Sequence, residues 1–334
     1  MVDPSRVRHV TRSKHIDRDL MAKLFERADA IQREMDACRR LGVPINLHLL
    51  RGYHIGLLFY EPSTRTRMSF ETAISRMGGT YTSTENAGEF SSAVKGESLE
   101  HTAEMMSGYV DAVVVRHKEN LAADRMASVS RIPVINAGDG TGQHPTQALL
   151  DVFTIKKELG KVDNLKVVIV GDLAHGRTAN SLAYMLGTNC DKIEMVFVSP
   201  PSLRIKQGVK DHLKARGISF REQDTLNDLL PEADVVYMTR LQKERMTEEE
   251  RKTAQSHRLV IDEGNLQLMR KSARLLHPLP IPTELGDPEI SLPSGVEAED
   301  QRVAYIRQAG YGVAVRAALL EDLLRHPFNG QGAP

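Results

Sequence analysis

The sequence predicts an α/β fold made of two similar-sized domains, each a parallel β-sheet flanked by helices. Three observations lead to this fold class. Short apolar stretches alternate with longer segments whose apolar residues recur at helical spacing. The chain has 334 residues, more than one hydrophobic core usually serves. Polar residues follow the predicted strands, at the edge where open parallel sheets bind ligands.

The first half of the chain shows this alternation clearly. Phe70, Ala73, Ile74 and Met77 have helical spacing, and Pro145 suits the first position of a helix. The strands expected here are 55–59, 112–115 and 133–136, and the helices are 17–40, 63–77, 98–109, 121–129 and 145–159. Residues 83–95 are polar and lack periodicity, so they are expected to form a surface loop, and 137–142 a glycine-rich turn.

The second half repeats the pattern from about Lys161 onward, and the two halves are joined through the helix that begins at Pro145. The strands expected here are 166–170, 194–198, 235–238 and 275–277, and the helices are 179–186, 203–216 and 311–325. Residues 281–299 are rich in proline, glycine and acids and are expected to form a surface loop.

Composition excludes several classes of protein. Lys plus Arg and Asp plus Glu both number 44, so no overall field favours nucleic acid or an anionic membrane. The only cysteines, Cys38 and Cys190, lie far apart without metal-ligand spacing, which favours a reducing compartment. No apolar run approaches the ~18 residues of a membrane span, and the N-terminus lacks a signal-peptide core. We therefore expect a cytoplasmic protein without a metal or other cofactor.

Residues 63–67, Ser-Thr-Arg-Thr-Arg, stand where strand 55–59 passes into a helix. The first N–H groups of a helix lack intrahelical partners and carry the positive end of its dipole. Hydroxyls and guanidiniums at such a turn indicate a phosphate site. The alternative is that Ser63 is an ordinary helix cap followed by solvated arginines.

Further cations occupy equivalent positions after other strands. The residues at strand ends or helix starts are Arg65, Arg116, His144, Gln147, Arg177 and Arg240. No arrangement of a nucleophile with a base is visible, and the glycines of 138–142 and 171–176 do not fit a dinucleotide fingerprint. Asp172 lacks companion metal ligands and is interpreted as structural. These features indicate electrostatic positioning of two anionic substrates without a covalent enzyme intermediate.

An ordered set of motifs resembles the aspartate and ornithine carbamoyltransferase family over residues 15–325. The motifs are 63–67, Lys95-Gly96-Glu97, Arg116-His117, 144–147 (His-Pro-Thr-Gln), 171–178, Thr239-Arg240 with 242–245, and 277–280 (His-Pro-Leu-Pro). Arg240-x-Gln242 and the His-Pro-Leu-Pro turn are similar to the aspartate branch. The ornithine branch typically has a Ser-Met-Gly segment and a His-Cys-Leu-Pro turn instead.

The resemblance implies a carbamoyl-phosphate domain (1–145), an aspartate domain (146–305) and a C-terminal helix (306–334) that returns to the first domain. It assigns carbamoyl phosphate to Ser63, Thr64, Arg65, Thr66, Arg116, His144, Gln147, Leu279 and Pro280. It assigns aspartate to Lys95, Arg177, Arg240 and Gln242, and polarisation of the carbonyl and stabilisation of the phosphate to Thr66, Arg116, His144 and Lys95. Ser91 and Lys95 would come from the neighbouring subunit of a homotrimer with shared sites. A cis bond is expected at Leu279–Pro280.

One departure from the family bears on specificity. An arginine usually follows His-Pro-Leu-Pro, whereas this chain has Ile281-Pro282 and then a longer loop. Three functions therefore stay open: aspartate carbamoyl transfer in pyrimidine biosynthesis, transfer to another acidic amino acid, and a non-catalytic paralogous subunit. The resemblance also leaves open whether a regulatory chain or a partner enzyme binds.

Overall fold

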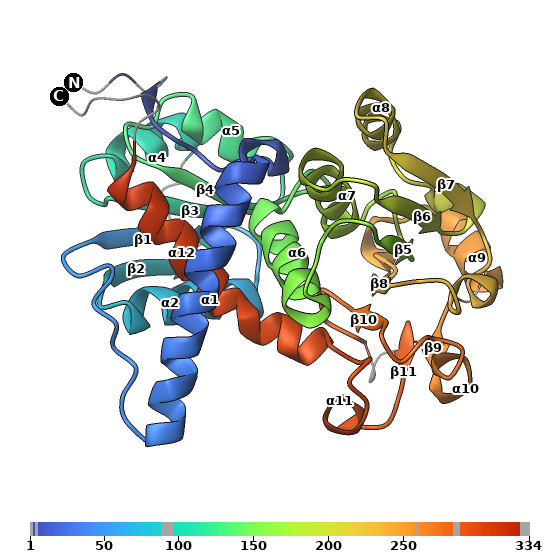
Figure 1. The fold of residues 1–334 in the computed structure, drawn as a ribbon. Coiled ribbons are helices and arrows are strands. Elements are labelled where there is room, and N and C mark those ends of the chain that lie inside the picture. The colour runs from blue at the N-terminus through green and yellow to red at the C-terminus, as the bar shows by residue number, and fades with distance from the viewer. Residues whose placement is uncertain (1–2, 4–5, 88–95, 258, 283–287, 328–334) are drawn as a thin grey trace. The chain divides into compact units, whose positions relative to one another are not determined.

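The computed structural model describes the chain except for residues 1–2, 4–5, 88–95, 258, 283–287 and 328–334 (Figure 1). It divides into two compact units. The first contains residues 1–146 and 311–334, and the second contains residues 147–310. The division falls after Thr146 and after Gly310, whereas the sequence analysis places the boundaries after residues 145 and 305.

The first unit is built on a four-stranded sheet of parallel strands in the order β2-β1-β3-β4. Its strands are β1 (His54–Phe59), β2 (Thr80–Glu85), β3 (Ala112–His117) and β4 (Val134–Asp139). Its helices are η2 (Ser13–His15), α1 (Arg18–Leu41), α2 (Thr64–Arg76), α4 (Leu99–Met106) and α5 (Ala122–Ala127). Buried side chains of α4 and α5 pack with Val113 and Val115 of β3 in one apolar cluster.

The second unit is built on a five-stranded sheet in the order β10-β8-β5-β6-β7, again parallel. Its strands are β5 (Lys166–Val170), β6 (Glu194–Val198), β7 (Ser219–Gln223), β8 (Val235–Met238) and β10 (Arg274–Leu276), and β9 (Ile261–Asp262) pairs separately with β11 (Ile290–Ser291). Its α-helices are α7 (Arg177–Asn189), α8 (Gln207–Ala215), α9 (Glu248–Ser256), α10 (Glu263–Leu266) and α11 (Val296–Glu299). The 3-10 turns are η4 (Pro201–Leu203), η5 (Asn227–Leu229) and η6 (Lys243–Arg245).

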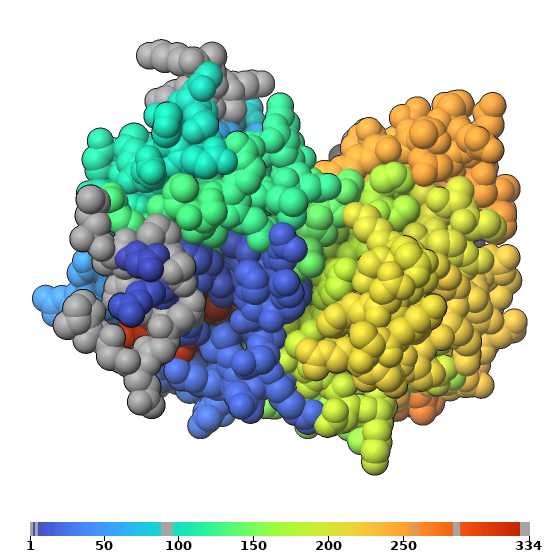
Figure 2. Space-filling view, turned by 90° about the horizontal axis from the view of Figure 1, so that it is seen from above, coloured from blue at the N-terminus to red at the C-terminus, as the bar shows by residue number. Residues whose placement is uncertain are grey.

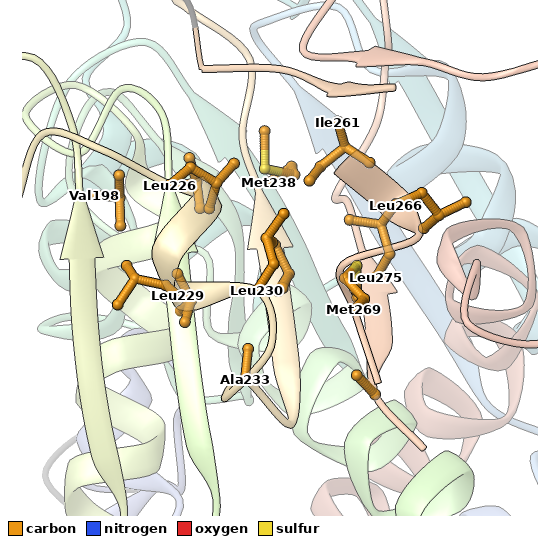
Figure 3. Packing of buried hydrophobic residues seen from close by; sticks show 14 of the residues in the cluster. Val198, Leu226, Leu229, Leu230, Ala233, Met238, Ile261, Leu266, Met269 and Leu275 are labelled. Carbon is orange, nitrogen blue, oxygen red and sulfur yellow. The ribbon is translucent and has the colours of Figure 1, made fainter. Parts of the chain in front are cut away.

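The central strands of the second unit consist almost entirely of apolar residues because they lie in its interior. β5, β6 and β8 are almost wholly buried, and their apolar side chains pack with Leu230, Leu266 and Leu275 (Figure 3). Strands buried on both faces carry nearly continuous apolar residues rather than an alternating pattern. β7 differs because it is an edge strand. With α8 it forms part of the exposed surface, yellow in Figure 2.

Two long helices pass from one unit into the other. α6 (Pro145–Leu159) starts in the first unit, and α12 (Tyr305–Arg325) starts in the second and ends in the first. The C-terminal part of α12 packs on α1, with Arg27 Nε donating to Glu321 at 2.6 Å and Lys23 Nζ donating to Asp322 at 2.6 Å. The expected return of the C-terminal helix to the first domain is therefore confirmed.

The predicted fold class is confirmed, and several predicted elements are wrong. Residues 80–85 form strand β2, so the polar segment expected as a loop from residue 83 begins within a strand. β4 extends to Asp139, inside the stretch expected as a turn. Residues 281–299 include β11 and α11, and α12 begins six positions earlier than expected, at Tyr305 instead of 311. Among the described residues, no helix is long and apolar enough to cross a membrane.

Candidate active site

The turn between β1 and α2 has the form of an anion site. Ser63 is the N-cap residue of α2, yet within the described part of the chain its hydroxyl makes no capping bond. The first-turn amides of α2 therefore keep their donor capacity, at the positive end of the helix dipole. Thr64 and Arg65 are exposed there, whereas Thr66 is buried. The structure thus does not support the interpretation of Ser63 as an ordinary side-chain cap.

Thr66 meets His144 inside the first unit. The Thr66 hydroxyl lies 3.4 Å from His144 Nε2, and Thr146 Oγ1 lies 3.4 Å from Nδ1 of the same ring. His144 is only 3% exposed. A hydroxyl beside each ring nitrogen holds the imidazole in place.

The position of His144 depends on the turn that follows β4. Buried Asp139 accepts hydrogen bonds from the amides of Gln143 and Leu121, both at 2.7 Å. A Cβ atom at Gly142 would lie 2.7 Å from Asp139 Oδ1, so this close approach requires glycine. The turn therefore delivers His144 to the start of α6 in a fixed orientation.

Arg116 lies near the end of β3, beside β1. Its Nη2 is 3.0 Å from Glu61 Oε2, and its carbonyl accepts from Tyr60 N at 2.9 Å. These contacts place Arg116 at the carboxyl edge of the sheet that also leads into the Ser63 turn. Arg67 has a different role, because it bonds to Glu71 and Glu85, each at 2.9 Å, and so ties α2 to β2.

In the second unit, Asp172 connects two loops at the carboxyl ends of β5 and β8. Its Oδ1 accepts from His175 N at 2.9 Å, and its Oδ2 accepts from Gln242 N at 3.2 Å. A Cβ atom at Gly171 would lie 2.2 Å from the Thr239 carbonyl oxygen, which explains glycine at its φ of 119°. Asp172 therefore fixes the segments that carry Arg177 and Gln242.

The two arginines at the carboxyl edge of the second sheet are Arg177 and Arg240, and carboxylates lie near Arg240. Arg177, the first residue of α7, is 9% exposed, and Arg240 is half-buried. Arg240 donates to Glu244 at 3.0 Å, and this pairing raises the pKa of Arg240 and lowers the pKa of Glu244. Glu289 is also close enough to act on Arg240, and burial raises the pKa of its carboxyl.

The turn that follows β10 contains the expected cis peptide bond between Leu279 and Pro280. The Leu279 amide donates to His277 Nδ1 at 2.8 Å, so this ring nitrogen is the acceptor that holds the turn. His277 Nε2 lies 4.0 Å from the Glu289 carboxylate. Ile281 is half-buried and packs against the apolar cluster of the second unit.

Gln147 lies in the first turn of α6 and is almost fully buried. Its Nε2 donates to Asp151 Oδ1 at 2.8 Å. The other end of the amide, Oε1, is thereby oriented away from Asp151 and can accept a hydrogen bond.

The structure thus brings the predicted site residues into two groups. The first unit holds Ser63, Thr64, Arg65, Thr66, Arg116 and His144, and the second holds Gln147, Arg177, Arg240, Gln242, Leu279 and Pro280. Ser91 and Lys95 lie outside the described residues. Sequence reasoning missed Asp151 and Glu289. A lone acid in the apolar run 148–153 was an available signal for Asp151, because buried carboxylates need partners.

In the described part of the chain, no cluster of three or more His, Cys, Asp or Glu residues could hold a metal ion. The arginine, threonine and histidine side chains of the site can supply hydrogen bonds and charge stabilisation. Such groups suit a reaction in which negative charge develops on a carbonyl oxygen and on a leaving phosphate.

Two family models match the chain in order. The carbamoyl-phosphate-binding domain of aspartate/ornithine carbamoyltransferase matches residues 8–157, and the aspartate/ornithine-binding domain matches residues 163–323. Aspartate carbamoyltransferase 3 of Pisum sativum, described as chloroplastic, is 45% identical over 316 residues, which are 94% of this chain and 77% of the pea protein.

Solved structures give the same family. Aspartate transcarbamoylase from Trypanosoma cruzi, in complex with N-(phosphonacetyl)-L-aspartic acid, aligns with a TM-score of 0.84 and 34% identity over 96% of this chain and 97% of that one. The catalytic subunit of aspartate transcarbamoylase from M. jannaschii aligns with a TM-score of 0.81 and 38% identity over 95% and 98%.

Proposed function

Because this chain belongs to the aspartate and ornithine carbamoyltransferase family, we propose that it transfers the carbamoyl group of carbamoyl phosphate to the amine of L-aspartate. The products are N-carbamoyl-L-aspartate and phosphate, as pyrimidine biosynthesis requires. The observation that carries the choice of acceptor is the pair Arg177 and Arg240 at the carboxyl edge of the second sheet. Two guanidiniums match the two carboxylates of aspartate, whereas the side chain of ornithine ends in a cation.

The first unit supplies the groups for carbamoyl phosphate. The amides and hydroxyls of Ser63, Thr64 and Thr66, together with Arg65 and Arg116, take the phosphate. The Thr66 hydroxyl and His144 lie 3.4 Å apart, and with Arg116 they can donate to the carbonyl oxygen. Donors aimed at the developing oxyanion accelerate acyl transfer because they interact most strongly with the transition state.

The second unit supplies acceptors for the carbamoyl NH2 and the cations for aspartate. Gln147 Oε1 and the carbonyls of Leu279 and Pro280 accept from the NH2 group. In the reaction, the neutral aspartate amine forms a C–N bond to the carbamoyl carbon, and the bond from that carbon to the phosphate oxygen breaks. The amine proton passes to the leaving phosphate, so His144 acts as a donor and not as a base.

The assembly we propose is a homotrimer with shared sites, in which Ser91 and Lys95 act in the neighbouring subunit. Membership of the family supports this proposal, and both residues lie outside the described part of the chain. Two cysteines in 334 residues likewise support a reducing, cytoplasmic location.

A second function is favoured by one feature only. Ile281 stands where the family usually has an arginine, which would suit an enzyme that acts on another acidic amino acid. A non-catalytic subunit is disfavoured, because such a chain need not keep the Thr66 and His144 donors together.

The test is an assay of the purified protein with carbamoyl phosphate and, separately, L-aspartate, L-glutamate and L-ornithine. The ureido product is detected by colour and the phosphate is measured in parallel. We expect equal amounts of both products with aspartate. Product with glutamate or ornithine alone would overturn the choice of aspartate. A folded protein that turns over none of the three would overturn the enzymatic function.

A further inference from the structure

A buried carboxylate lies behind the groups assigned to the carbamoyl NH2. Asp151 of α6 is fully buried and accepts three hydrogen bonds: from Gln147 Nε2 at 2.8 Å, from Gln308 Nε2 at 2.6 Å and from the Tyr237 hydroxyl at 2.8 Å. All four residues belong to the second unit. Buried polar groups with this many partners hold one another in a single arrangement.

The first branch of this network sets the orientation of Gln147. A side-chain amide can turn by 180° and exchange its oxygen and nitrogen, but Asp151 is the acceptor in all three of its hydrogen bonds. Asp151 therefore selects the orientation in which Gln147 Nε2 faces it and Oε1 faces away. Burial raises the pKa of Tyr237 well above its ordinary value, so the tyrosine keeps its proton and its hydroxyl donates a hydrogen bond to Asp151.

The second branch leads to the turn at Leu279. Gln308, at the start of α12, uses Nε2 on Asp151, and its Oε1 accepts from the amide of His277 at 2.9 Å. His277 Nδ1 in turn accepts from the Leu279 amide at 2.8 Å. Gln308 and His277 are each 1% exposed. One carboxylate therefore fixes both Gln147 and the backbone turn that carries the Leu279 and Pro280 carbonyls.

We propose that Asp151 is a positioning residue that orients the acceptors for the carbamoyl NH2, and that it thereby makes the site distinguish carbamoyl phosphate from an acyl phosphate without that NH2. The inference rests on the proposed function, which places carbamoyl phosphate at these acceptors. A site built to pair with an N–H group rejects the analogue that lacks it, because its own polar groups are then left without partners.

The test compares carbamoyl phosphate with acetyl phosphate, which has a methyl group in place of the NH2. Dissociation constants for both ligands are measured by calorimetry on wild-type protein and on Asp151→Asn. An asparagine at position 151 can donate as well as accept hydrogen bonds. The side-chain amide of Gln147 can then rotate by 180° and exchange the positions of its oxygen and nitrogen. We expect the dissociation constant of carbamoyl phosphate to rise by about tenfold or more and that of acetyl phosphate to change less than twofold. The selectivity ratio, which compares the two constants, should fall accordingly.

Two further variants separate positioning from stability. Asp234→Asn is the matched control, because Asp234 accepts from Lys166 N at 2.8 Å and from Arg270 at 3.0 Å next to the opposite end of β8. It should lower the melting temperature and leave the ratio unchanged. Gln308→Met removes the branch to His277 together with one of the three donors to Asp151, but it keeps the bond from Gln147, so it should lower the ratio by a smaller factor. It also tests the inference if Asp151→Asn does not fold.

The outcomes are distinct. If wild-type protein neither binds carbamoyl phosphate nor forms product, the proposed function fails. If wild-type protein turns over normally but does not discriminate between the ligands, or if both ligands weaken equally in Asp151→Asn, the positioning role is overturned. An unchanged ratio between the dissociation constants of the two ligands, in a folded Asp151→Asn or Gln308→Met variant, would also overturn the positioning role.

Discussion

The Thr66 hydroxyl and His144 Nε2 lie 3.4 Å apart although 78 positions separate the two residues in the chain. The first lies in the first turn of α2, and the second follows the Asp139 turn of β4. Parallel strands bring such turns to one edge of a sheet, so these two buried polar side chains meet where, under the proposed function, the carbonyl oxygen gains charge.

Removing the Thr66 donor should slow the chemical step. We expect Thr66→Val to lower kcat by about 10²–10³-fold, equivalent to about 2.7–4 kcal/mol of transition-state stabilisation. The affinity for carbamoyl phosphate should fall much less, and steady-state kinetics with both substrates measure the difference. Thr84→Val is the control, because Thr84 Oγ1 bonds only weakly, at 3.5 Å, to the Leu57 carbonyl. A raised KM with unchanged kcat would show that Thr66 contributes ground-state binding alone.

Arg240 separates the two substrates. Arg240→Ala should abolish turnover and leave the calorimetric affinity for carbamoyl phosphate within twofold, because this side chain belongs to the cations of the second unit that we propose for aspartate. Stability should change by less than about 1 kcal/mol, since the pair with exposed Glu244 is solvated. Arg251→Ala is the control from the adjacent α9, where Arg251 bonds to the Lys243 carbonyl. Equal loss of carbamoyl phosphate affinity would contradict this division of roles.

The shared site can be tested by mixing inactive chains. If Lys95 acts in the neighbouring subunit, hybrids of Lys95→Ala and Arg65→Ala chains contain one kind of site with both native residues. Partial recovery of activity is expected. A chain that carries both substitutions, mixed with Arg65→Ala, should give none. Absence of recovery in hybrids that are shown to form would refute sharing of the site.

Glu289 should give the stability of the second unit a distinct pH dependence. Burial, the largest cause, raises the pKa of this carboxyl above its ordinary value of 4.5. The native state therefore holds a proton that the unfolded state has released, and stability falls as pH rises from 4.5 through the native pKa, by at most about 1.4 kcal/mol per pH unit.

Glu289→Gln keeps an oxygen that can accept from the Leu241 amide, a bond of 2.8 Å in the wild type, and removes the titration. Thermal unfolding of both proteins across the acid range should show the variant gaining stability relative to wild type as pH rises. Parallel curves would mean that Glu289 ionises in the native state as readily as in the unfolded chain.

The limits of the sequence prediction have a physical cause. The central strands were predictable because burial on both faces requires apolar residues throughout. β2 was not, because its residues Thr80–Glu85 are mostly exposed and it is held by backbone pairing to β1. β7 is the equivalent edge strand of the second sheet, and its sequence does not predict a strand for the same reason.

The same distinction holds at the site. The sequence predicts Arg116, His144 and Arg240 as site residues because each lies at or after the carboxyl end of a strand and carries a charge or ring suited to an anion, and these assignments stay predictions. The bond between Asp151 and Gln308 joins residues 157 positions apart, so no local pattern predicts that these two side chains pair. Such pairs follow from tertiary packing, which periodicity does not report.

The resemblance to the family leads us to expect an arginine at position 281, where this chain has isoleucine. Ile281 packs against the apolar cluster of the second unit directly after the Leu279–Pro280 turn, and Pro282 fixes its own φ and restricts the backbone of Ile281. An arginine here could form charge-assisted hydrogen bonds of roughly 1.5–3 kcal/mol each if sheltered. The replacement of isoleucine by arginine would also lose part of the roughly 1.5–3 kcal/mol that full burial of an isoleucine contributes to stability.

We therefore predict that Ile281→Arg changes the KM for the amino acid more than the KM for carbamoyl phosphate. Leu292→Arg is the matched control, because Leu292 is also partly buried against the same cluster. If aspartate is the substrate, the longer loop already compensates, and the change is small or harmful. If another acidic amine is the substrate, aspartate turnover should improve about tenfold, or about 1.4 kcal/mol. Unchanged kinetics for both substrates would show that position 281 has no part in specificity, because neither the loss of packing nor the new charge then reaches the amino-acid site.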